Sequence, residues 1–296
     1  PAAPAGPAPC AATRAVEAAT TMTETPDDLH IDIVGNGPPL VLLHGWAMHG
    51  GVFAPLRERL RRTHTLYIVD LPGHGHSRDS AVPLALEPVV DALARVVPPA
   101  PWLGWSLGGL FALHAAATRP DIATSLVMVC ANPRFVSARD WPHGMAPQVF
   151  RDFASGLRSD YRGTLDRFIA LEAFGSDDAR GELRTLRAEV FARGEPATRV
   201  LVDGLGLLES VDLRKTLPGL QVPSLWLAGR RDRLVDPRAM HDAAGRAPTG
   251  TAITLDHAGH APFLTHADAV VEQLHAFLPD AAAAVADGPD VRTLPQ

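Results

Sequence analysis

A serine flanked by glycines stands where the chain changes from an apolar, strand-like run to a helical pattern. Ser106 is the centre of a G-W-S-L-G segment, residues 104–108, which follows the apolar run 101–103 and precedes the helical run 109–117. In this context a G-x-S-x-G motif predicts a tight turn that strains the serine and leaves its hydroxyl exposed above the sheet. The glycines remove the Cβ atoms that would collide there. Ser106 is therefore the candidate nucleophile.

A serine hydroxyl becomes a good nucleophile only when a base accepts its proton, and the best placed of the 13 histidines is His260. It lies in the segment D-H-A-G-H-A-P-F, residues 256–263, where a loop leaves the last predicted strand and the final helix begins. This position brings a side chain to the C-terminal edge of the sheet, where ligands bind in such folds. His257 is the alternative base.

The imidazole also needs a carboxylate that holds its tautomer and stabilises its positive charge. Asp232 follows the predicted strand 222–228 and gives the order serine, aspartate, histidine along the chain. The competing interpretation is that Asp232 pairs with one of its arginine neighbours, and Asp236 is a candidate N-cap for the next helix. We predict a catalytic triad of Ser106, Asp232 and His260.

Backbone N–H groups aimed at the oxyanion would complete the site, each contributing on the order of a hundredfold to a thousandfold in rate. One predicted donor is the N–H of Leu107, at the start of the helix that follows Ser106. The second is the N–H of Trp46, in an H-G-W segment that follows an apolar strand. We expect His44 of this segment to brace the loop through hydrogen bonds rather than to transfer protons.

The segment D-L-P-G-H-G-H-S, residues 70–77, contains an aspartate and two histidines, but its proline and glycines predict a shaped loop. No cysteines or carboxylates stand near His74 and His76 with metal-ligand spacing, and the chain has no P-loop or dinucleotide signature. We therefore expect no cofactor and no metal.

Short apolar runs alternate with helical patterns, which is typical of an α/β fold with a mostly parallel sheet and helices on both faces. The first two strands, 29–34 and 40–44, are expected to form an opening hairpin, and a helix is expected over 262–278. From 132 to 218 strand signals are absent and helical segments follow one another. The predicted division is an α/β core of 29–131 and 219–279, a helical cap of 132–218, and tails of 1–28 and 280–296.

Composition narrows the class of protein. The chain has 296 residues, of which 46% are hydrophobic and 20% charged, as in ordinary soluble domains. The net charge of -6 argues against nucleic acid as a general partner. No apolar run could span a bilayer, and the N-terminus lacks the pattern of a secretion signal, so no membrane contact is expected. The two cysteines, Cys10 and Cys130, are not expected to form a disulfide, a cytoplasmic location fits best, and Met22 is a candidate start.

Several segments together resemble the α/β-hydrolase superfamily: H-G-W at 44–46, D-x-P-G-x-G-x-S at 70–77, G-W-S-L-G-G at 104–109, G-x-x-D at 229–232 and G-H-A-P-F at 259–263. Within it, the chain is similar to the pimeloyl-ACP methyl ester carboxylesterases of biotin synthesis, through H-G-W-A-M, G-W-S-L-G-G, F-V-S-A-R-D-W-P at 135–142 and V-D-L-R at 211–214. The resemblance implies an α/β-hydrolase fold with a helical cap. It also implies a substrate in which acyl carrier protein carries a methyl-capped pimeloyl chain.

The outer face of the cap is expected to carry the docking site for this carrier. Carrier proteins of this kind are acidic, and arginine suits bidentate contact with carboxylates. The spacing of Arg180, Arg184 and Arg187 places them on one helix face. Arg162 and Arg167 are expected to add to this face from the preceding helix. In the family, arginines of the cap helices bind the carrier protein, and the resemblance assigns this role here to Arg167, Arg180 and Arg184. The alternative is a surface helix with ordinary ion pairs.

Trp46, Phe135 and Phe168 are the expected lining of the substrate pocket, and generic core packing is the other interpretation. Three further functions remain open from the sequence: a general short-chain carboxylesterase, a carbon–carbon bond hydrolase with the same triad, and a non-catalytic ligand receptor on the same scaffold. Dehalogenase and epoxide hydrolase chemistry is disfavoured, because those enzymes of this fold use an aspartate where this chain has Ser106.

Overall fold

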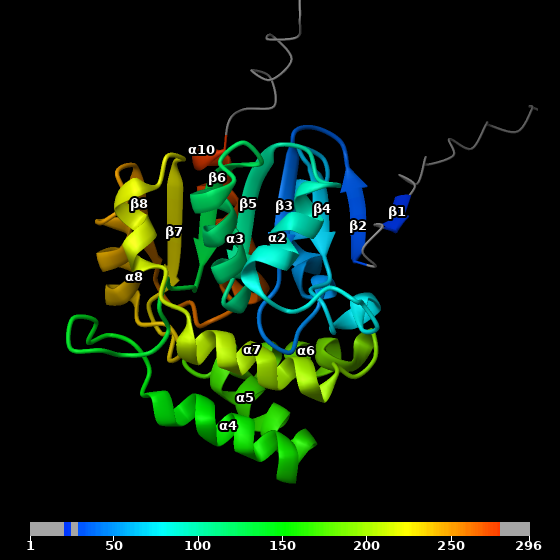
Figure 1. The fold of residues 1–296 in the computed structure, drawn as a ribbon, viewed down its shortest axis with the longest axis vertical. Helices are drawn as coiled ribbons and strands as arrows, with labels where there is room; N and C mark the ends of the chain where they lie inside the picture. Colours follow the sequence, from blue (N-terminus) through cyan, green and yellow to red (C-terminus); the bar gives the residue numbers. More distant parts are fainter. Residues whose placement is uncertain (1–20, 25–28, 279–296) are drawn as a thin grey trace, which may run out of the picture.

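The computed structural model describes residues 21–24 and 29–278, in which strands and helices alternate (Figure 1). The strands are β1 Thr21–Glu24, β2 His30–Gly35, β3 Pro39–Leu43, β4 Thr65–Val69, β5 Ala100–Trp105, β6 Ala123–Val129, β7 Ser224–Gly229 and β8 Gly250–Leu255. The α-helices are α1 Ala54–Leu60, α2 Leu86–Ala94, α3 Leu107–Thr118, α4 Pro147–Ser159, α5 Tyr161–Ala173, α6 Ala179–Ala192, α7 Thr198–Ser210, α8 Pro237–Ala244, α9 Pro262–Thr265 and α10 Ala267–Phe277. Short 3-10 helices are η1 Gly50–Phe53, η2 Gly75–Ser77 and η3 Arg214–Gly219.

The strands form one sheet in the order β1-β2-β4-β3-β5-β6-β7-β8. From β4 to β8 in this order all neighbours are parallel, whereas β2 is antiparallel to both β4 and β1. The central strands are almost wholly buried and apolar, because helices cover both faces. In Figure 1, α2, α3 and α8 lie in front of the sheet and α10 lies behind it, where it packs with α1. The mostly parallel sheet is confirmed.

The predicted opening hairpin is wrong, because β4 lies between β2 and β3. The turn after β2 packs against the loop that precedes β4. Gly35 and Gly37 have φ of +105° and +132°, and a Cβ on them would collide with the backbone oxygens of His64 and Thr63, respectively. This close approach sends β3 to the far side of β4 instead of back along β2.

Two further expectations differ from the structure. Residues 21–24, assigned by composition to the N-terminal tail, form β1 at the sheet edge, because β2 offers them an unpaired row of backbone groups. The expected single helix over 262–278 is divided into α9 and α10 at His266, whose φ of -128° and ψ of 39° are not helical. The other residues of the two expected tails, and Cys10, lie outside the described residues.

Helices α4 to α7 follow one another between β6 and β7 and lie at the end of the sheet toward which the parallel strands point (Figure 1). They belong to the segment 132–218, which is called the cap below. Each has an apolar side turned inward, such as Leu201, Leu205 and Leu208 on α7. Within 21–24 and 29–278, no helix is long and apolar enough to cross a membrane.

Candidate active site

Ser106 stands at the sharp turn between β5 and α3. Its φ of 52° and ψ of -119° are values that residues other than glycine rarely adopt. A Cβ on Gly104 would collide with Gly108 O, and a Cβ on Gly108 would collide with Leu43 O, so only glycine fits at either position. Ser106 N–H donates to Val129 O at 3.1 Å, which fixes the turn against β6. The strained turn expected from the motif is confirmed.

Asp232 and His260 come together from the loops that follow β7 and β8. His260 Nδ1 lies 2.8 Å from Asp232 Oδ2, and both side chains are buried. Asp232 Oδ1 accepts hydrogen bonds from the N–H groups of Leu234 at 2.8 Å and Val235 at 3.0 Å. The carboxylate is thus held where it accepts the Nδ1 proton, and this tautomer keeps a lone pair on Nε2. The pairing of Asp232 with an arginine, the competing interpretation, does not occur among the described residues.

His257, the alternative base, is exposed and contacts other groups. Its Nδ1 lies 2.8 Å from Arg231 Nη2 and 3.4 Å from Asp177 Oδ2. Asp236 accepts a hydrogen bond from Arg238 N–H at 2.9 Å and is the N-cap of α8, as predicted. Neither residue therefore competes with the buried aspartate–histidine pair.

Trp105, for which the sequence suggested no role, joins the serine turn to the histidine loop. Its indole Nε1 donates to His260 O at 2.8 Å, and its ring packs edge-on against Phe263 with centroids 5.1 Å apart. His260 Nε2 is buried and has no hydrogen-bond partner among the described residues. Because Trp105 precedes Ser106 in the chain, the indole bond ties the backbone of the histidine to the serine turn and leaves Nε2 available.

The loop after β3 is a turn braced by a neutral histidine. His44 Nδ1 donates to Gly45 O at 2.8 Å, and its Nε2 accepts the N–H of Leu71 at 2.9 Å. Burial lowers the pKa of His44 to about 3, so the ring is neutral at pH 7 and suits both bonds. The bracing role expected for His44 is confirmed. Neither Trp46 N–H, in this turn, nor Leu107 N–H takes part in a hydrogen bond within the described residues.

The side chain of Trp46 points into the cap. Its Nε1 donates to Leu201 O of α7 at 2.8 Å, and its ring meets Phe168 of α5 edge-on with centroids 4.4 Å apart. Gly204 of α7 packs directly on this site, because a Cβ there would lie 2.7 Å from Trp46 Cδ1 and 3.4 Å from Leu107 Cδ2. Two of the three expected lining residues are therefore in contact, between the core and the cap.

The cap leaves the serine almost no contact with solvent. Ser106 is 3% exposed. Phe168 touches both Trp46 and Phe153 through its ring, whereas Phe135 is buried in the loop after β6 and, in 29–278, makes no ring contact with that group. The structure thus does not bring Phe135 together with the other two, and its place in the pocket stays a prediction.

Arg193, which directly follows α6, ties the cap to the core and could not be recognised from the sequence. It donates to Asp70 Oδ2 at 3.1 Å and to Asp32 Oδ2 at 2.6 Å. Asp70 also accepts the N–H groups of Gly50 at 2.6 Å and His76 at 2.8 Å. Burial opposes ionisation of Asp70, but Arg193 and these hydrogen bonds hold its pKa below the usual value. The loop that begins at Asp70 is therefore structural, as predicted.

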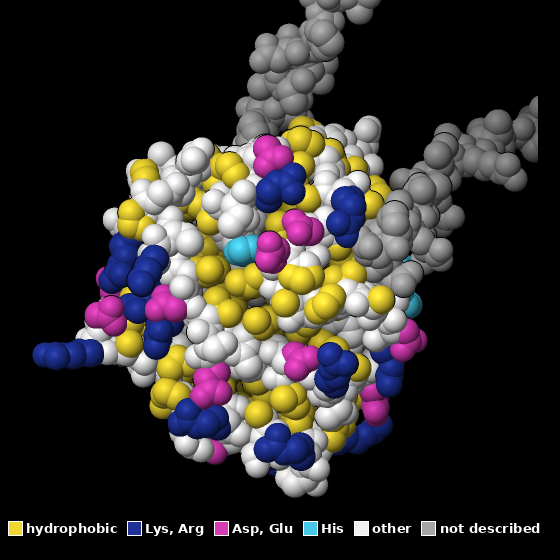
Figure 2. Space-filling model, viewed as in Figure 1, with side chains coloured by type: hydrophobic (Ala, Val, Ile, Leu, Met, Phe, Trp, Pro, Cys, Tyr) yellow, Lys and Arg dark blue, Asp and Glu magenta, His cyan; other side chains and the backbone are white. Residues whose placement is uncertain are grey.

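The four arginines predicted to bind a carrier protein are exposed on α5 and α6. The ion pairs in this region are Arg162–Glu195, Arg167–Asp160 at 3.3 Å and Arg187–Asp166 at 3.0 Å. Arg180 and Arg184 have no ion pair within the part of the chain that the structure describes. Figure 2 shows acidic and basic side chains interspersed over one face of the molecule, with basic ones gathered at the edge near α8. The ion-pair interpretation therefore applies to Arg162 and Arg167, and the binding of a carrier protein by the four arginines stays a prediction.

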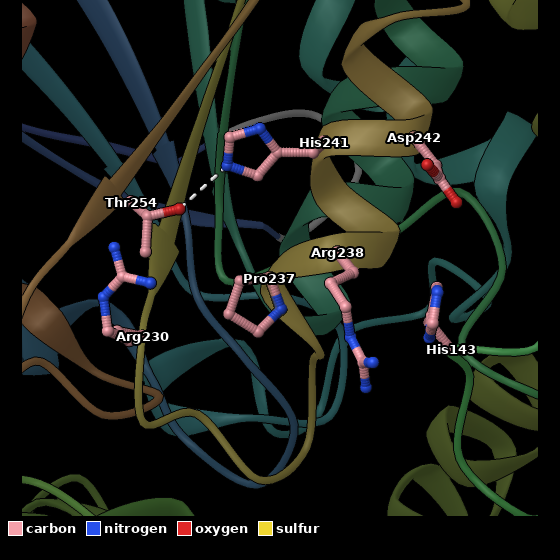
Figure 3. A pocket seen from close by; sticks show the side chains of 7 residues that line it. All are labelled: His143, Arg230, Pro237, Arg238, His241, Asp242 and Thr254. Carbon is pink, nitrogen blue, oxygen red and sulfur yellow. Dashed lines mark hydrogen bonds between the residues drawn. The ribbon is translucent and has the colours of Figure 1, made fainter.

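An open cavity of about 710 Å³ lies beside α8 (Figure 3). It is lined by His143, Arg230, Pro237, Arg238, His241, Asp242 and Thr254. His241 hydrogen bonds to Thr254 at 2.8 Å, and Arg230 and Arg238 each pair with an aspartate, so much of its charge is balanced. None of the three predicted catalytic residues lines this cavity.

Cys130 is a third titratable group next to the aspartate–histidine pair. Its sulfur and the nearest ligand atoms of Asp232 and His260 lie within 4.8 Å of one another. Burial raises the pKa of the Cys130 thiol well above its usual range, so the thiol is protonated. Because His260 Nδ1 is also engaged by Asp232, the geometry favours a hydrogen-bonded pair over a metal centre.

Comparison with known proteins gives the same architecture. Residues 38–267 match the family model described as alpha/beta hydrolase fold. The chain belongs to this family. It is 60% identical over 250 residues to the pimeloyl-[acyl-carrier protein] methyl ester esterase of Xanthomonas campestris pv. campestris (strain B100), across 84% of this chain and 98% of that protein. The protein of the same name from Stenotrophomonas maltophilia (strain K279a) is 58% identical over 260 residues, across 88% and 99%.

Among solved structures, the esterase EaEST from Exiguobacterium antarcticum superposes on this alpha/beta hydrolase with a TM-score of 0.75. The match covers 88% of this chain and 99% of that chain at 20% sequence identity, and at this identity the likeness concerns the fold alone. The resemblance to the methyl ester esterases seen in the short motifs is therefore confirmed over most of the chain, and so is the predicted fold class.

Proposed function

We propose that this chain is a carboxylesterase that removes the methyl ester from pimeloyl-[acyl-carrier protein], a step of biotin synthesis. The observation that carries the chemistry is the 2.8 Å hydrogen bond between Asp232 and His260 at the sheet edge where Ser106 is held at φ 52°. The names of the relatives at 58% and 60% identity support the choice of substrate.

In the proposed reaction, Ser106 Oγ attacks the terminal ester carbonyl while His260 Nε2 takes the hydroxyl proton. Asp232 holds the imidazole and stabilises its positive charge, and the N–H groups of Trp46 and Leu107 donate to the oxyanion. Collapse of the tetrahedral intermediate breaks the bond to the methoxy group, which takes the proton from His260 and leaves as methanol. A water molecule that gives a proton to His260 then attacks the acyl-enzyme. Collapse of this second intermediate breaks the bond to Ser106 Oγ, which takes the proton back from His260 as the free acid leaves.

We propose that the cap covers the acyl chain and presents the carrier-docking surface. Trp46 and Phe168 are placed to line the chain, because they meet at the junction of core and cap beside Leu107. Arg180 and Arg184 are the better candidates for carrier contact, since their charges are not neutralised by neighbouring acids. A carrier-bound substrate of this kind fits a cytoplasmic enzyme.

The test compares a methyl ester on acyl carrier protein with the free monomethyl ester of the same diacid. Intact-mass measurement follows loss of the methyl group, and kcat/KM for the carrier-bound ester should be well above that for the free one. The Ser106→Ala variant is the control: its turnover should fall by about 10⁴-fold or more, with the melting temperature unchanged.

Each alternative function predicts a different outcome of this test. Equal rates on both esters would indicate a general short-chain carboxylesterase. Cleavage of a carbon–carbon bond with no methyl loss would indicate the hydrolase alternative. Labelling of Ser106 by a fluorophosphonate without ester turnover would indicate a ligand receptor. Retention of most esterase activity by Ser106→Ala would overturn the assignment of the nucleophile.

A further inference from the structure

Two glutamates of the cap are buried without a partner. Glu172 on α5 is 0% exposed and Glu182 on α6 is 2% exposed. None of their four carboxyl oxygens has a hydrogen-bond partner among the described residues. Removing a carboxyl group from water without such a partner costs free energy, so a pair of this kind calls for a role other than packing.

The two glutamates flank a connection that lies on the loops of the active site. This connection joins α5 to α6, and it contacts both loops. A Cβ on Gly175 would lie 2.5 Å from Arg231 O, and a Cβ on Gly259 would lie 3.3 Å from Ser176 Cβ. Each of these loops also supplies one member of the aspartate–histidine pair. The cap therefore places its buried carboxyl groups against the part of the core that holds His260.

The charges around Glu182 are mixed. Burial raises its pKa to about 7. The groups that lower this pKa are the Ser176 hydroxyl, His260 and the Ala261 N–H, whereas Asp232 raises it. The hydroxyl and the N–H face the carboxyl group without completing a hydrogen bond. Glu182 is thus ionised above about pH 7. His260 is the neighbouring group whose positive charge favours this ionisation.

The pKa of Glu172 is raised further than that of Glu182, although both side chains are buried. Burial, together with the charges of Glu182 and Asp232, raises the pKa of Glu172 well above its usual range. Its carboxyl group therefore resists ionisation far more strongly than that of an exposed glutamate. The Cys130 thiol, which also feels Glu182, is protonated as well. Among the acids of this cluster, Asp232 and Glu182 are the two that can oppose a positive charge on His260.

A cavity lies next to Glu182. This cavity of about 270 Å³ lies between α6 and α9, and its other polar lining includes Asp178, Arg184 and Thr265. Glu172 is not part of this lining. Water in the cavity can exchange protons with Glu182.

We propose that Glu182 is a positioning residue: the cap lays its carboxylate beside His260, where the negative charge stabilises the imidazolium that forms as Ser106 attacks. This inference rests on the esterase function proposed above. Asp232 supports the imidazolium from the core at Nδ1, and Glu182 adds a second anion from the cap.

The test measures kcat/KM for the free methyl ester as a function of pH in the full chain and in Glu182→Gln. Wild type should exceed the variant by about tenfold at pH 8.5, where Glu182 is ionised, because its negative charge stabilises the imidazolium formed in the transition state. The ratio should approach one at pH 5.5, where the carboxyl group is protonated in the wild type. Glu182→Asp, which keeps the charge, should keep a pH-dependent advantage over Glu182→Gln.

Glu172→Gln is the matched control, since glutamine resembles the protonated carboxyl group already present there. Its ratio to wild type should not change with pH. A loss of activity in Glu182→Gln that is the same at every pH, or no loss, would overturn the inference, and melting temperatures distinguish a folding defect. If Glu182→Gln does not fold, the Glu182→Asp variant decides the question. The proposal is contradicted if kcat/KM of Glu182→Asp does not change with pH near pH 7. Failure of the esterase assignment would instead appear as no hydrolysis of the methyl ester by the wild type at any pH.

Discussion

The sheet edge that carries the catalytic residues and the outer face of the cap are held in opposite ways. At the sheet edge, each residue is fixed by its surroundings: Ser106 by its strained turn, Asp232 by two backbone N–H groups, and His260 by the Trp105 indole bonded to its backbone oxygen. On the outer face, the arginines are exposed, and a surface ion pair is worth little in free energy. Substitutions should therefore change the chemical step in the first region and only the capture of a charged partner in the second.

The largest effect in this comparison is expected for Asp232→Asn. An asparagine amide favours the wrong tautomer of His260, so kcat should fall by about 10³-fold to 10⁴-fold while KM changes little. Steady-state kinetics with the free methyl ester measure both kcat and KM of this variant. Asp236→Asn, which changes the nearby N-cap of α8, is the control and should keep near wild-type kcat. A tenfold or smaller loss in Asp232→Asn would mean that the carboxylate is only structural.

An intermediate effect is expected where the two regions meet. Gly204→Ala puts a methyl group 2.7 Å from Trp46 Cδ1, so either the indole or α7 must move. Overpacking of this kind lowers the free energy of unfolding by about 1–3 kcal/mol. Displacement of the proposed oxyanion donor should lower kcat/KM by about ten- to a hundredfold.

Gly206→Ala on the same helix is the control, because no atom lies within 4 Å of a Cβ there. Alanine favours the helix, so this variant should be more stable by about 0.5–1 kcal/mol, with unchanged kinetics. Thermal unfolding of both variants decides the matter. Equal melting temperatures and equal kinetics in Gly204→Ala and Gly206→Ala would mean that α7 does not pack tightly on Trp46.

The smallest effects are expected on the outer face. Arg180→Glu and Arg184→Glu should each lower kcat/KM for the carrier-bound ester by about tenfold or less, and the loss should shrink as salt rises. Arg162→Glu and Arg167→Glu should lose less, since Glu195 and Asp160 already offset those charges. The free ester should be hydrolysed at the wild-type rate by all four variants. Equal losses on both substrates would show that this face does not bind the carrier.

The meeting of the three proposed catalytic residues at one sheet edge could be predicted from the sequence, because each lies just after a strand. Parallel strands bring their ends to one edge, so Ser106, Asp232 and His260 needed no knowledge of the packing. The positions of β2 and β3 could not be predicted, since they depend on the contact of Gly35 and Gly37 with the loop before β4.

The buried glutamates of the cap could not be predicted either. At helical spacing, Glu172 and Glu182 are indistinguishable from solvent-exposed acids, because their burial depends on how α5 and α6 dock on the core. The same holds for Arg193, whose partners Asp32 and Asp70 are more than a hundred residues away in the chain. Contacts between residues so far apart in the chain leave no pattern in the local sequence.

The two ends of α6 lie over opposite halves of the sheet. Before the helix, Asp177 pairs with Arg231, which follows β7, and after it Arg193 pairs with Asp70, which follows β4. The 14 residues of α6 span about 21 Å, and β4 and β7 are four strands apart, or about 19 Å. The length of α6 thus matches the distance between β4 and β7. This length is therefore a constraint in its own right, and a one-turn deletion would release one end whatever residues it removed.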